Sequence, residues 1–215
     1  MEILSLESSC YRVFRDRRTP RQVGYPTEGE DVLESDIDHA ISNFEFCWSD
    51  TPKDLSRFSD GSWNVLYTAE KCETAVTEVV YHLDKNFGSG YASGDEMIFR
   101  LVQYGVIFNG TCACFANSDP ETQSPLVAND NEYRYTIGVA DDLRSSAQAI
   151  RTPSARRINE LCIPILDEEA AAIRDVAIPV TVTMVRGSTT FKSLRESRTM
   201  DLEIHDVHSH IVPKP

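Results

Sequence analysis

The chain has 215 residues, of which 41% are hydrophobic and 26% charged, and this length and composition are typical of a globular domain with a substantial core. Its 34 acidic residues outnumber 21 basic ones, giving a formal net charge of −13. Such a charge argues against nonspecific binding to nucleic acid or to an anionic membrane. No apolar run approaches the roughly 20 residues of a membrane span, and the N-terminus lacks the basic and apolar regions of a signal peptide. The sequence therefore predicts a single cytoplasmic domain over residues 1–215.

The cysteines and histidines do not follow the spacing of a metal site. The one close cysteine pair, Cys112 and Cys114, is tighter than the usual zinc-binding pair. Without a signal peptide a disulfide framework is not expected, so we interpret most of the six cysteines as small buried apolar residues. His205, His208 and His210 lack an acid or cysteine to complete a site, and we expect them to lie in a mobile tail.

The first third of the chain contains one strand signal, one loop signal and one helix signal. Residues 9–16 are rich in aromatic and β-branched residues and predict a strand. Residues 24–38 are polar and acidic with Pro and Gly, which indicates a surface loop. Residues 36–48 suggest a short helix or an aromatic segment that closes onto the core.

The stretch over residues 57–83 has the strongest pattern in the chain. The apolar run from Trp63 to Tyr67 follows Gly61 and predicts a short buried strand. Apolar residues then recur at helical spacing and predict a helix with one core-facing stripe, formed by Cys72, Ala75, Val76, Val79, Val80 and Leu83. Glu78 lies at the edge of this stripe, where partial desolvation of a carboxylate gives it functional potential.

The second half is dominated by strand signals. Residues 96–108 predict a strand that ends at the turn Asn109-Gly110, and residues 111–133 indicate an irregular connection with lid character. Residues 135–150 contain a predicted helix with Asp141 and Asp142 near its start. Beyond it we expect a turn at 152–157, strands at 161–166, 178–186 and 200–204, and a short helix at 168–175. These elements predict an α+β fold with a strand-rich core and flanking helices.

Three ordered blocks of sequence resemble the RES-domain family, toxins of bacterial toxin–antitoxin pairs named for an Arg, a Glu and a Ser. The first block is Tyr11-Arg12-Val13, and the third is Thr152-Pro153-Ser154-Ala155-Arg156. The second runs from Arg57 through Tyr67 to Glu78, Tyr81 and His82. The motif-bearing part covers about residues 10–166, leaving 167–215 as C-terminal strands and tail. The chain departs from the family where Gly61-Ser62-Trp63 replaces the frequent Gly-Arg-Trp, with the arginine displaced to Arg57.

The resemblance implies a single domain similar to the fold of ADP-ribosyltransferase toxins, with NAD as its substrate. It implies cleavage of the nicotinamide–ribose bond, with phosphate or water accepting ADP-ribose. A protein mono-ADP-ribosyltransferase is the alternative within enzymes, and a noncatalytic interaction module is the alternative of another class. The implied partner is a small antitoxin with a helix-turn-helix domain, which would make any DNA contact. The sequence leaves open a homo-oligomer within that complex.

The resemblance also assigns residues. Arg12, Glu78 and Ser154 are the predicted catalytic set, and Arg12, Arg57, Tyr67 and Ser154 the predicted NAD-binding set. Guanidinium groups suit a pyrophosphate, and a carboxylate suits the positive charge that develops on ribose as its glycosidic bond breaks. We expect Tyr67 to stack on nicotinamide or to hydrogen-bond the ligand, and Ser154 to donate to a phosphate or ribose oxygen without acting as a nucleophile. No metal is required, because the leaving group is already cationic.

Each of these residues has a plain structural interpretation when taken alone. Arg12 would be a surface ion-pair residue, Tyr67 a core aromatic residue and Ser154 a turn residue or helix cap. Glu78 would be a solvated helix residue, and we interpret His82 as a residue on the flank of the same helix rather than a catalyst. The ordered set, rather than any single member, supports the functional hypothesis.

Overall fold

The computed structural model describes residues 1–15, 34–87, 96–128, 133–174, 178–185, 188–193 and 198–201. The helices are α2 (Glu34–Trp48), α3 (Cys72–Phe87), α4 (Pro120–Val127) and α5 (Arg134–Leu143), with a 3-10 turn at Glu168–Ala170. The strands are β1 (Glu2–Arg15), β2 (Glu96–Cys114), β3 (Ala149–Pro153), β4 (Leu161–Cys162), β5 (Ala171–Ile173), β6 (Ile178–Val185), β7 (Ser188–Ser193) and β8 (Arg198–Asp201).

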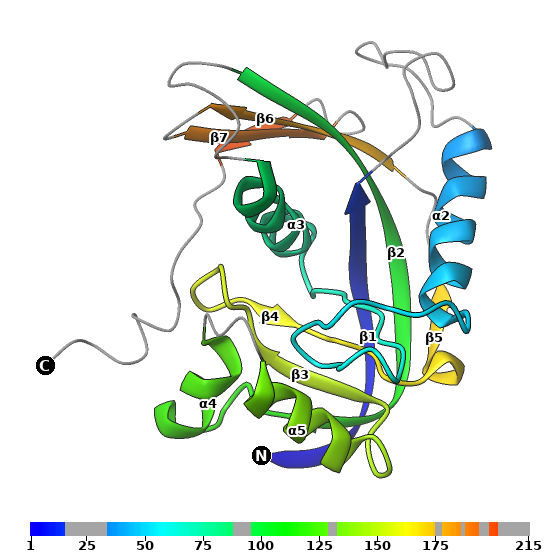
Figure 1. Cartoon of the computed structure of the whole chain (residues 1–215), viewed down its shortest axis with the longest axis vertical. Coiled ribbons are helices and arrows are strands. Elements are labelled where there is room, and N and C mark those ends of the chain that lie inside the picture. The colour runs from blue at the N-terminus through cyan, green and yellow to red at the C-terminus, as the bar shows by residue number, and fades with distance from the viewer. Residues whose placement is uncertain are drawn as a thin grey trace, which may run out of the picture.

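The strands form one eight-stranded sheet with the order β4-β3-β2-β6-β7-β8, in which β1 and β5 also pair with β2. The helices flank this sheet, with α2 and α3 on opposite sides of the β1–β2 pair (Figure 1). The predicted α+β class, with a strand-rich core and flanking helices, is therefore confirmed. Within the described ranges, no helix has both the length and the apolar character needed to cross a membrane.

Strand β2 is the central strand of the sheet. It is 19 residues long and pairs antiparallel with β1 over the whole of β1, from Glu2 opposite Cys114 to Arg15 opposite Leu101. Its first part also pairs with β6, and its last residues run parallel to β3. The strand predicted at 9–16 is thus confirmed but begins at Glu2, seven residues earlier than expected.

The turn predicted at Asn109-Gly110 is wrong. Both residues lie inside β2, opposite Glu7 and Leu6 of β1, and the strand continues to Cys114. A Cβ at position 110 would clash with the side-chain oxygen of Gln148, which accepts a hydrogen bond from the next backbone N–H of β2. The glycine therefore permits close approach of a side chain to the sheet rather than a chain reversal.

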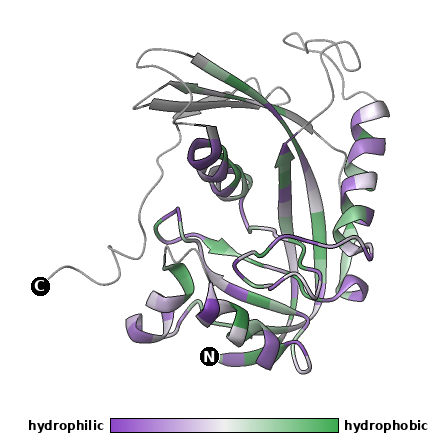
Figure 2. Cartoon of the chain, in the orientation of Figure 1, coloured by the Kyte–Doolittle hydropathy of each residue, from purple (hydrophilic) through white to green (hydrophobic). Residues whose placement is uncertain are grey.

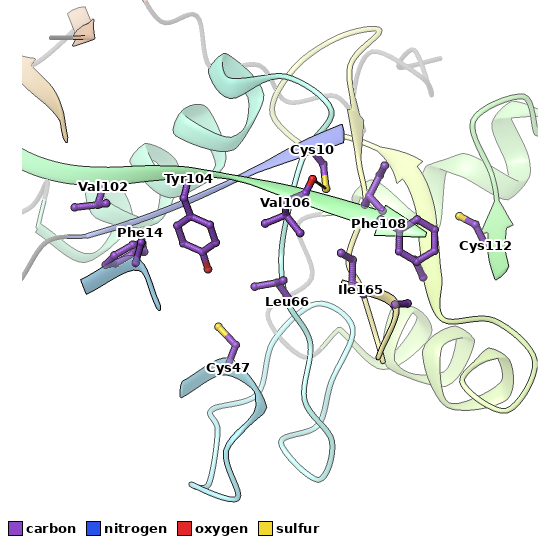
Figure 3. Close-up of a cluster of buried hydrophobic side chains, with 14 residues drawn as sticks. Cys10, Phe14, Cys47, Leu66, Val102, Tyr104, Val106, Phe108, Cys112 and Ile165 are labelled. Atoms are coloured by element: carbon purple, nitrogen blue, oxygen red, sulfur yellow. Dashed lines mark hydrogen bonds between the residues drawn. The ribbon is translucent and has the colours of Figure 1, made fainter. Parts of the chain in front are cut away.

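The central core lies where α2 and the chain around Leu66 cover the β1–β2 pair. Figure 3 shows Phe14 of β1 beside Tyr104 of β2, whose rings meet edge to face at 6.1 Å, with Val106 further along the strand. Leu66 is fully buried in the same cluster. The buried-thiol interpretation is confirmed for four cysteines, Cys10, Cys47, Cys112 and Cys114, whereas Cys72 and Cys162 are half-buried.

Helix α3 is the predicted amphipathic helix, and it continues four residues beyond Leu83. Val76, Val80 and Leu83 are buried against β1, β2 and β6, and polar residues occupy the other side of the helix (Figure 2). The remaining members of the predicted stripe are buried or half-buried in the same cluster. This packing fixes the rotation of α3 and so decides where Glu78 points.

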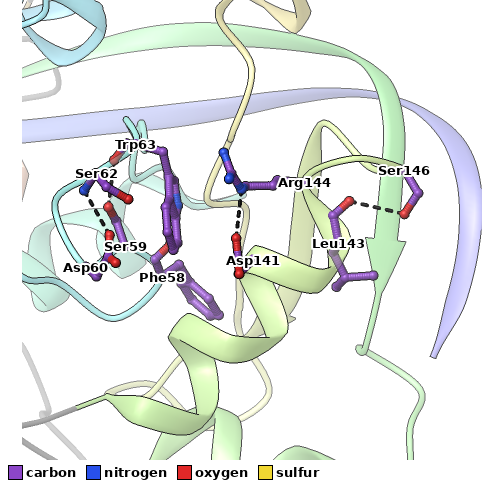
Figure 4. Close-up of polar contacts among 9 residues, drawn as sticks. All are labelled: Phe58, Ser59, Asp60, Ser62, Trp63, Asp141, Leu143, Arg144 and Ser146. Carbon is purple, nitrogen blue, oxygen red and sulfur yellow. Dashed lines mark hydrogen bonds and ion pairs between the residues drawn. The ribbon is translucent and has the colours of Figure 1, made fainter.

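The strand predicted from Trp63 to Tyr67 is wrong. This stretch forms only an isolated bridge, between Leu66 and Ile165, because its first part folds back on itself. The indole N–H of Trp63 donates to the carbonyl of Phe58 at 2.9 Å, and the Ser59 hydroxyl donates to the carbonyl of Trp63 at 2.6 Å. Figure 4 shows this compact turn packed beside α5.

Several boundaries in the second half differ from the prediction. The expected irregular connection at 111–133 contains the end of β2 and helix α4, whose first turn is capped by Asp119. The helix expected within 135–150 begins at Arg134 and ends at Leu143, so Asp141 and Asp142 lie at its end rather than near its start.

Other elements are partly as expected. The helix at 36–48 is confirmed. It begins two residues earlier, at Glu34, so the predicted loop at 24–38 does not extend beyond residue 33. The strand at 161–166 shortens to β4, and residues 168–175 contain a 3-10 turn followed by β5. Strand β6 is confirmed, and β7 was not predicted. Strand β8 overlaps the first two residues of the strand predicted at 200–204, and residues 202–204 lie outside the described residues. Most of the predicted loop at 24–38 and the tail with His205, His208 and His210 lie outside the described residues.

Candidate functional site

A cavity of about 390 Å³ opens between α3, β1, the β3–β4 pair and the chain around residues 55–58. This volume falls in the range of about 300–1,000 Å³ that is usual for small-molecule sites. Four of the five predicted site residues line it, and they come from separate parts of the chain: Arg12 from β1, Arg57 and Tyr67 from the segment before α3, and Glu78 from α3. The fold therefore brings these four predicted residues together.

Glu78 is held by one of its two carboxylate oxygens. Its Oε1 accepts a hydrogen bond from the hydroxyl of Ser154 at 2.6 Å and from the backbone N–H of Ala155 at 3.2 Å. The thiol of Cys162 also approaches Oε1, at 3.8 Å. Its Oε2 accepts no hydrogen bond from the described residues. The carboxylate is thus fixed in orientation and keeps one oxygen for a ligand in the cavity.

Ser154 lies behind Glu78 rather than in the lining of the cavity. Its side chain is fully buried, and its hydroxyl donates to Glu78 and accepts from the backbone N–H groups of Arg156 and Arg157, at 3.1 Å each. With these contacts the hydroxyl has no capacity for the phosphate or ribose contact expected from the sequence. The structure instead makes Ser154 a support for the carboxylate.

Arg12 reaches the cavity from β1. Its Nη1 donates to the backbone carbonyl of Tyr67 at 3.1 Å, while its buried Nε has no hydrogen-bond partner in the part of the chain that the structure describes. Among those residues Arg12 forms no ion pair with a carboxylate. Within the described part of the chain, its positive charge is therefore not neutralised by a direct neighbour.

Arg57 approaches the cavity from the segment before α3. Its Nη1 donates to the backbone carbonyls of Leu126 at 2.8 Å and Ala128 at 3.0 Å, at the C-terminal end of α4. Its guanidinium lies 5.1 Å from the ring centroid of Tyr133. Like Arg12, it has no carboxylate partner among the described residues, and Glu78 is the one acidic side chain in the lining. The cavity is thus a local basic site in a protein of net charge −13.

The hydroxyl of Tyr67 is already engaged within the protein. It donates to the hydroxyl of Ser56 at 2.8 Å and accepts from the backbone N–H of Phe58 at 2.9 Å. Burial raises the pKa of Tyr67, so the phenol stays neutral. Of the two contacts expected for this residue, stacking through the ring face fits this geometry better than a hydrogen bond to the ligand.

Sequence reasoning missed several residues of the site. His82, left out of the predicted sets, lines the cavity, as do Thr152 and Cys162, which face each other across the β3–β4 pair. Burial and the nearby Glu78 carboxylate raise the pKa of Cys162 well above its usual value, which keeps the thiol neutral. Thr152 belongs to the sequence block Thr152-Pro153-Ser154-Ala155-Arg156 that resembles the family, and its place in this block was the one sequence signal for it. Nothing in the sequence indicated that Cys162 would reach Glu78.

The described residues contain no group of three or more His, Cys, Asp or Glu side chains placed to hold a metal ion.

Comparison with protein families identifies one domain. The model of the RES domain matches residues 36–186, more than half of the chain, including Arg57, Tyr67, Glu78 and Ser154. Arg12 precedes the matched range, although its strand pairs with β2 along the whole of β1. Comparison with curated proteins gives no match.

Proposed function

Since the chain belongs to the RES-domain family, we propose that it cleaves the nicotinamide–ribose bond of NAD and acts in the cytoplasm as the toxin of a toxin–antitoxin pair. One observation carries this proposal. The Glu78 carboxylate is anchored through Oε1 and open at Oε2, in a cavity that is also lined by two arginines without carboxylate partners among the described residues.

The reaction needs stabilisation of a positively charged sugar. As the bond between nicotinamide and ribose breaks, the bonding electrons leave with nicotinamide, which departs neutral, and positive charge develops on the ribose. The free Oε2 of Glu78 accepts a ribose hydroxyl hydrogen bond and faces this charge. Because Oε1 is already held, little reorganisation is needed when the charge appears.

The other groups bind the rest of the dinucleotide. Arg12 and Arg57 supply guanidinium groups for the pyrophosphate, and burial strengthens their interaction with it. The ring of Tyr67 stacks on nicotinamide. Ser154 acts through Glu78, which it orients, rather than on NAD.

The acceptor is phosphate or water. An acceptor oxygen forms a bond to the anomeric carbon as nicotinamide leaves, giving ADP-ribose phosphate from phosphate and ADP-ribose from water.

The proposed partner is a small antitoxin with a helix-turn-helix domain that covers the cavity and makes any DNA contact. An antitoxin that bound the toxin without slowing NAD turnover would contradict this part of the proposal. The net charge of −13 is consistent with a toxin that does not itself bind DNA.

The test is incubation of the purified protein with NAD in buffers with and without inorganic phosphate, followed by product analysis. ADP-ribose phosphate formed only with phosphate supports phosphorolysis, whereas free ADP-ribose in both buffers supports hydrolysis. Labelled ADP-ribose retained on a protein would support the transferase alternative. A folded protein that releases no nicotinamide under any of these conditions contradicts the proposed activity.

A further inference from the structure

Arg156 is a buried charged side chain directly beside the site. It is 2% exposed and is the largest of the fully buried side chains in the described part of the chain. Removing a guanidinium from water costs several kcal/mol even after relaxation of the protein. Such a residue is retained where its charge or its hydrogen bonds serve a specific arrangement.

The side chain of Arg156 connects the two elements that hold Glu78. Its guanidinium carbon lies 3.5 Å from the ring centroid of Tyr81, which follows Glu78 by one turn on α3. Its Nη1 donates to the carbonyl of Ala155 at 3.0 Å, and the N–H of Ala155 donates to Glu78. Arg156 thereby links the turn after β3 to the face of α3 that carries the carboxylate.

The charge of Arg156 also interacts with Glu78. Burial lowers the pKa of Arg156, and the Glu78 carboxylate opposes that effect. The opposite charges of the two side chains therefore attract each other. Both the geometry and the charge therefore act on the same side chain.

We propose that Arg156 is a positioning residue that keeps the Glu78 carboxylate directed into the cavity without touching NAD. This inference rests on the proposed function, since it concerns the same carboxylate. It assigns a role to an arginine that neither lines the cavity nor belongs to the predicted site residues.

Other groups also face Glu78, and they remain in place when Arg156 is replaced. The turn after β3 contributes the Ser154 hydroxyl and the Ala155 N–H, and β4 contributes the neutral Cys162 thiol. His82 lies one turn further along α3, and Arg12 and Arg57 line the same cavity. A loss of kcat in an Arg156 variant can therefore be assigned to the missing guanidinium.

The test compares Arg156→Met and Arg156→Lys with Arg157→Met, the adjacent arginine, for which no side-chain contact joins it to Glu78. For Arg156→Met we expect kcat to fall about tenfold or more, with KM within about threefold, because the ligand-binding arginines are retained. Arg156→Lys should restore kcat in part, and Arg157→Met should behave as wild type.

A wild-type kcat in folded Arg156→Met would overturn the inference, as would a loss of thermal stability with kcat and KM unchanged. If Arg156→Met does not fold, Tyr81→Leu removes the stacking partner while keeping the guanidinium, and a lower kcat is again expected.

Failure of the proposed function is distinguished by a measurement that needs no turnover. Crystal structures of wild type and Arg156→Met report the direction of the Glu78 side chain directly. A Glu78 carboxylate that has moved away from the Ser154 hydroxyl in the variant supports the inference even if NAD is not the substrate, and an unchanged position overturns it.

Discussion

Replacement of Ser154 by alanine tests how the carboxylate is held. The change removes the hydroxyl that donates to Glu78 Oε1 at 2.6 Å and accepts from the N–H groups of Arg156 and Arg157. The N–H of Ala155 remains on Oε1, so Glu78 keeps one of its two close donors. We expect a protein that folds and binds NAD but orients its carboxylate poorly.

The size of the effect follows from these contacts. A hydrogen bond to a charged group contributes about 1.5–3 kcal/mol, and a buried N–H left without a partner costs about 1–3 kcal/mol. Since the surroundings relax in part, we expect a loss of about 2–4 kcal/mol in the free energy of unfolding, or about 5–15 °C in Tm for a chain of this size. We expect kcat to fall about 10–100-fold, equivalent to about 1.4–2.7 kcal/mol, with little change in KM.

The assay is nicotinamide release at several NAD concentrations, with Tm measured on the same preparations. Ser146→Ala is the matched control, because among the described residues the Ser146 hydroxyl donates only to the carbonyl of Leu143 at the end of α5, away from the cavity (Figure 4). Wild-type kcat in Ser154→Ala would refute the supporting role. A rise in KM at constant kcat would instead show that Ser154 contacts the substrate.

Two further predictions concern buried groups. Burial raises the pKa of Cys112 from 9.0 to about 11, so its thiol stabilises the fold fully below pH 9, and this contribution falls as pH rises toward 11. Wild type should therefore lose about 1.4 kcal/mol more than Cys112→Ala between pH 8 and pH 10, measured by denaturant unfolding, and equal losses would refute the assignment. The Thr152 hydroxyl is buried without a hydrogen-bond partner among the described residues, so Thr152→Val should raise the free energy of unfolding by about 1 kcal/mol and Tm by about 2–4 °C. A lower Tm in that variant would show that the hydroxyl is bonded in solution.

Elements with a strong local pattern were predictable from the sequence. Helix α3 was found because its apolar residues recur at helical spacing, and β6 because its residues are apolar and β-branched. The prediction of a turn at Asn109-Gly110 was wrong because a local turn signal does not reveal a 19-residue strand that pairs with β1, β3, β5 and β6. Tertiary pairing decided that position, not local preference.

The candidate site was likewise predictable only in part from the sequence. The family resemblance selected Arg12, Arg57, Tyr67 and Glu78, and the fold brings all four to one cavity. The contact between Ser154 and Glu78 joins residues 76 positions apart, and no local pattern specifies such a contact. The burial of Arg156 could not be predicted either, because charged residues are mostly exposed and only the packing of the fold shows that this one is buried.

The measurement that tests the central claim most directly is nicotinamide release from NAD by Glu78→Gln beside wild type, with Glu73→Gln on the same helix as control. Glutamine can still accept the hydrogen bonds of Ser154 and Ala155, so the variant removes the charge and preserves the shape. We expect a fall in kcat of about 10²–10³-fold, the loss typical for one preorganised electrostatic group, with NAD binding retained. Undiminished release by Glu78→Gln would contradict the account.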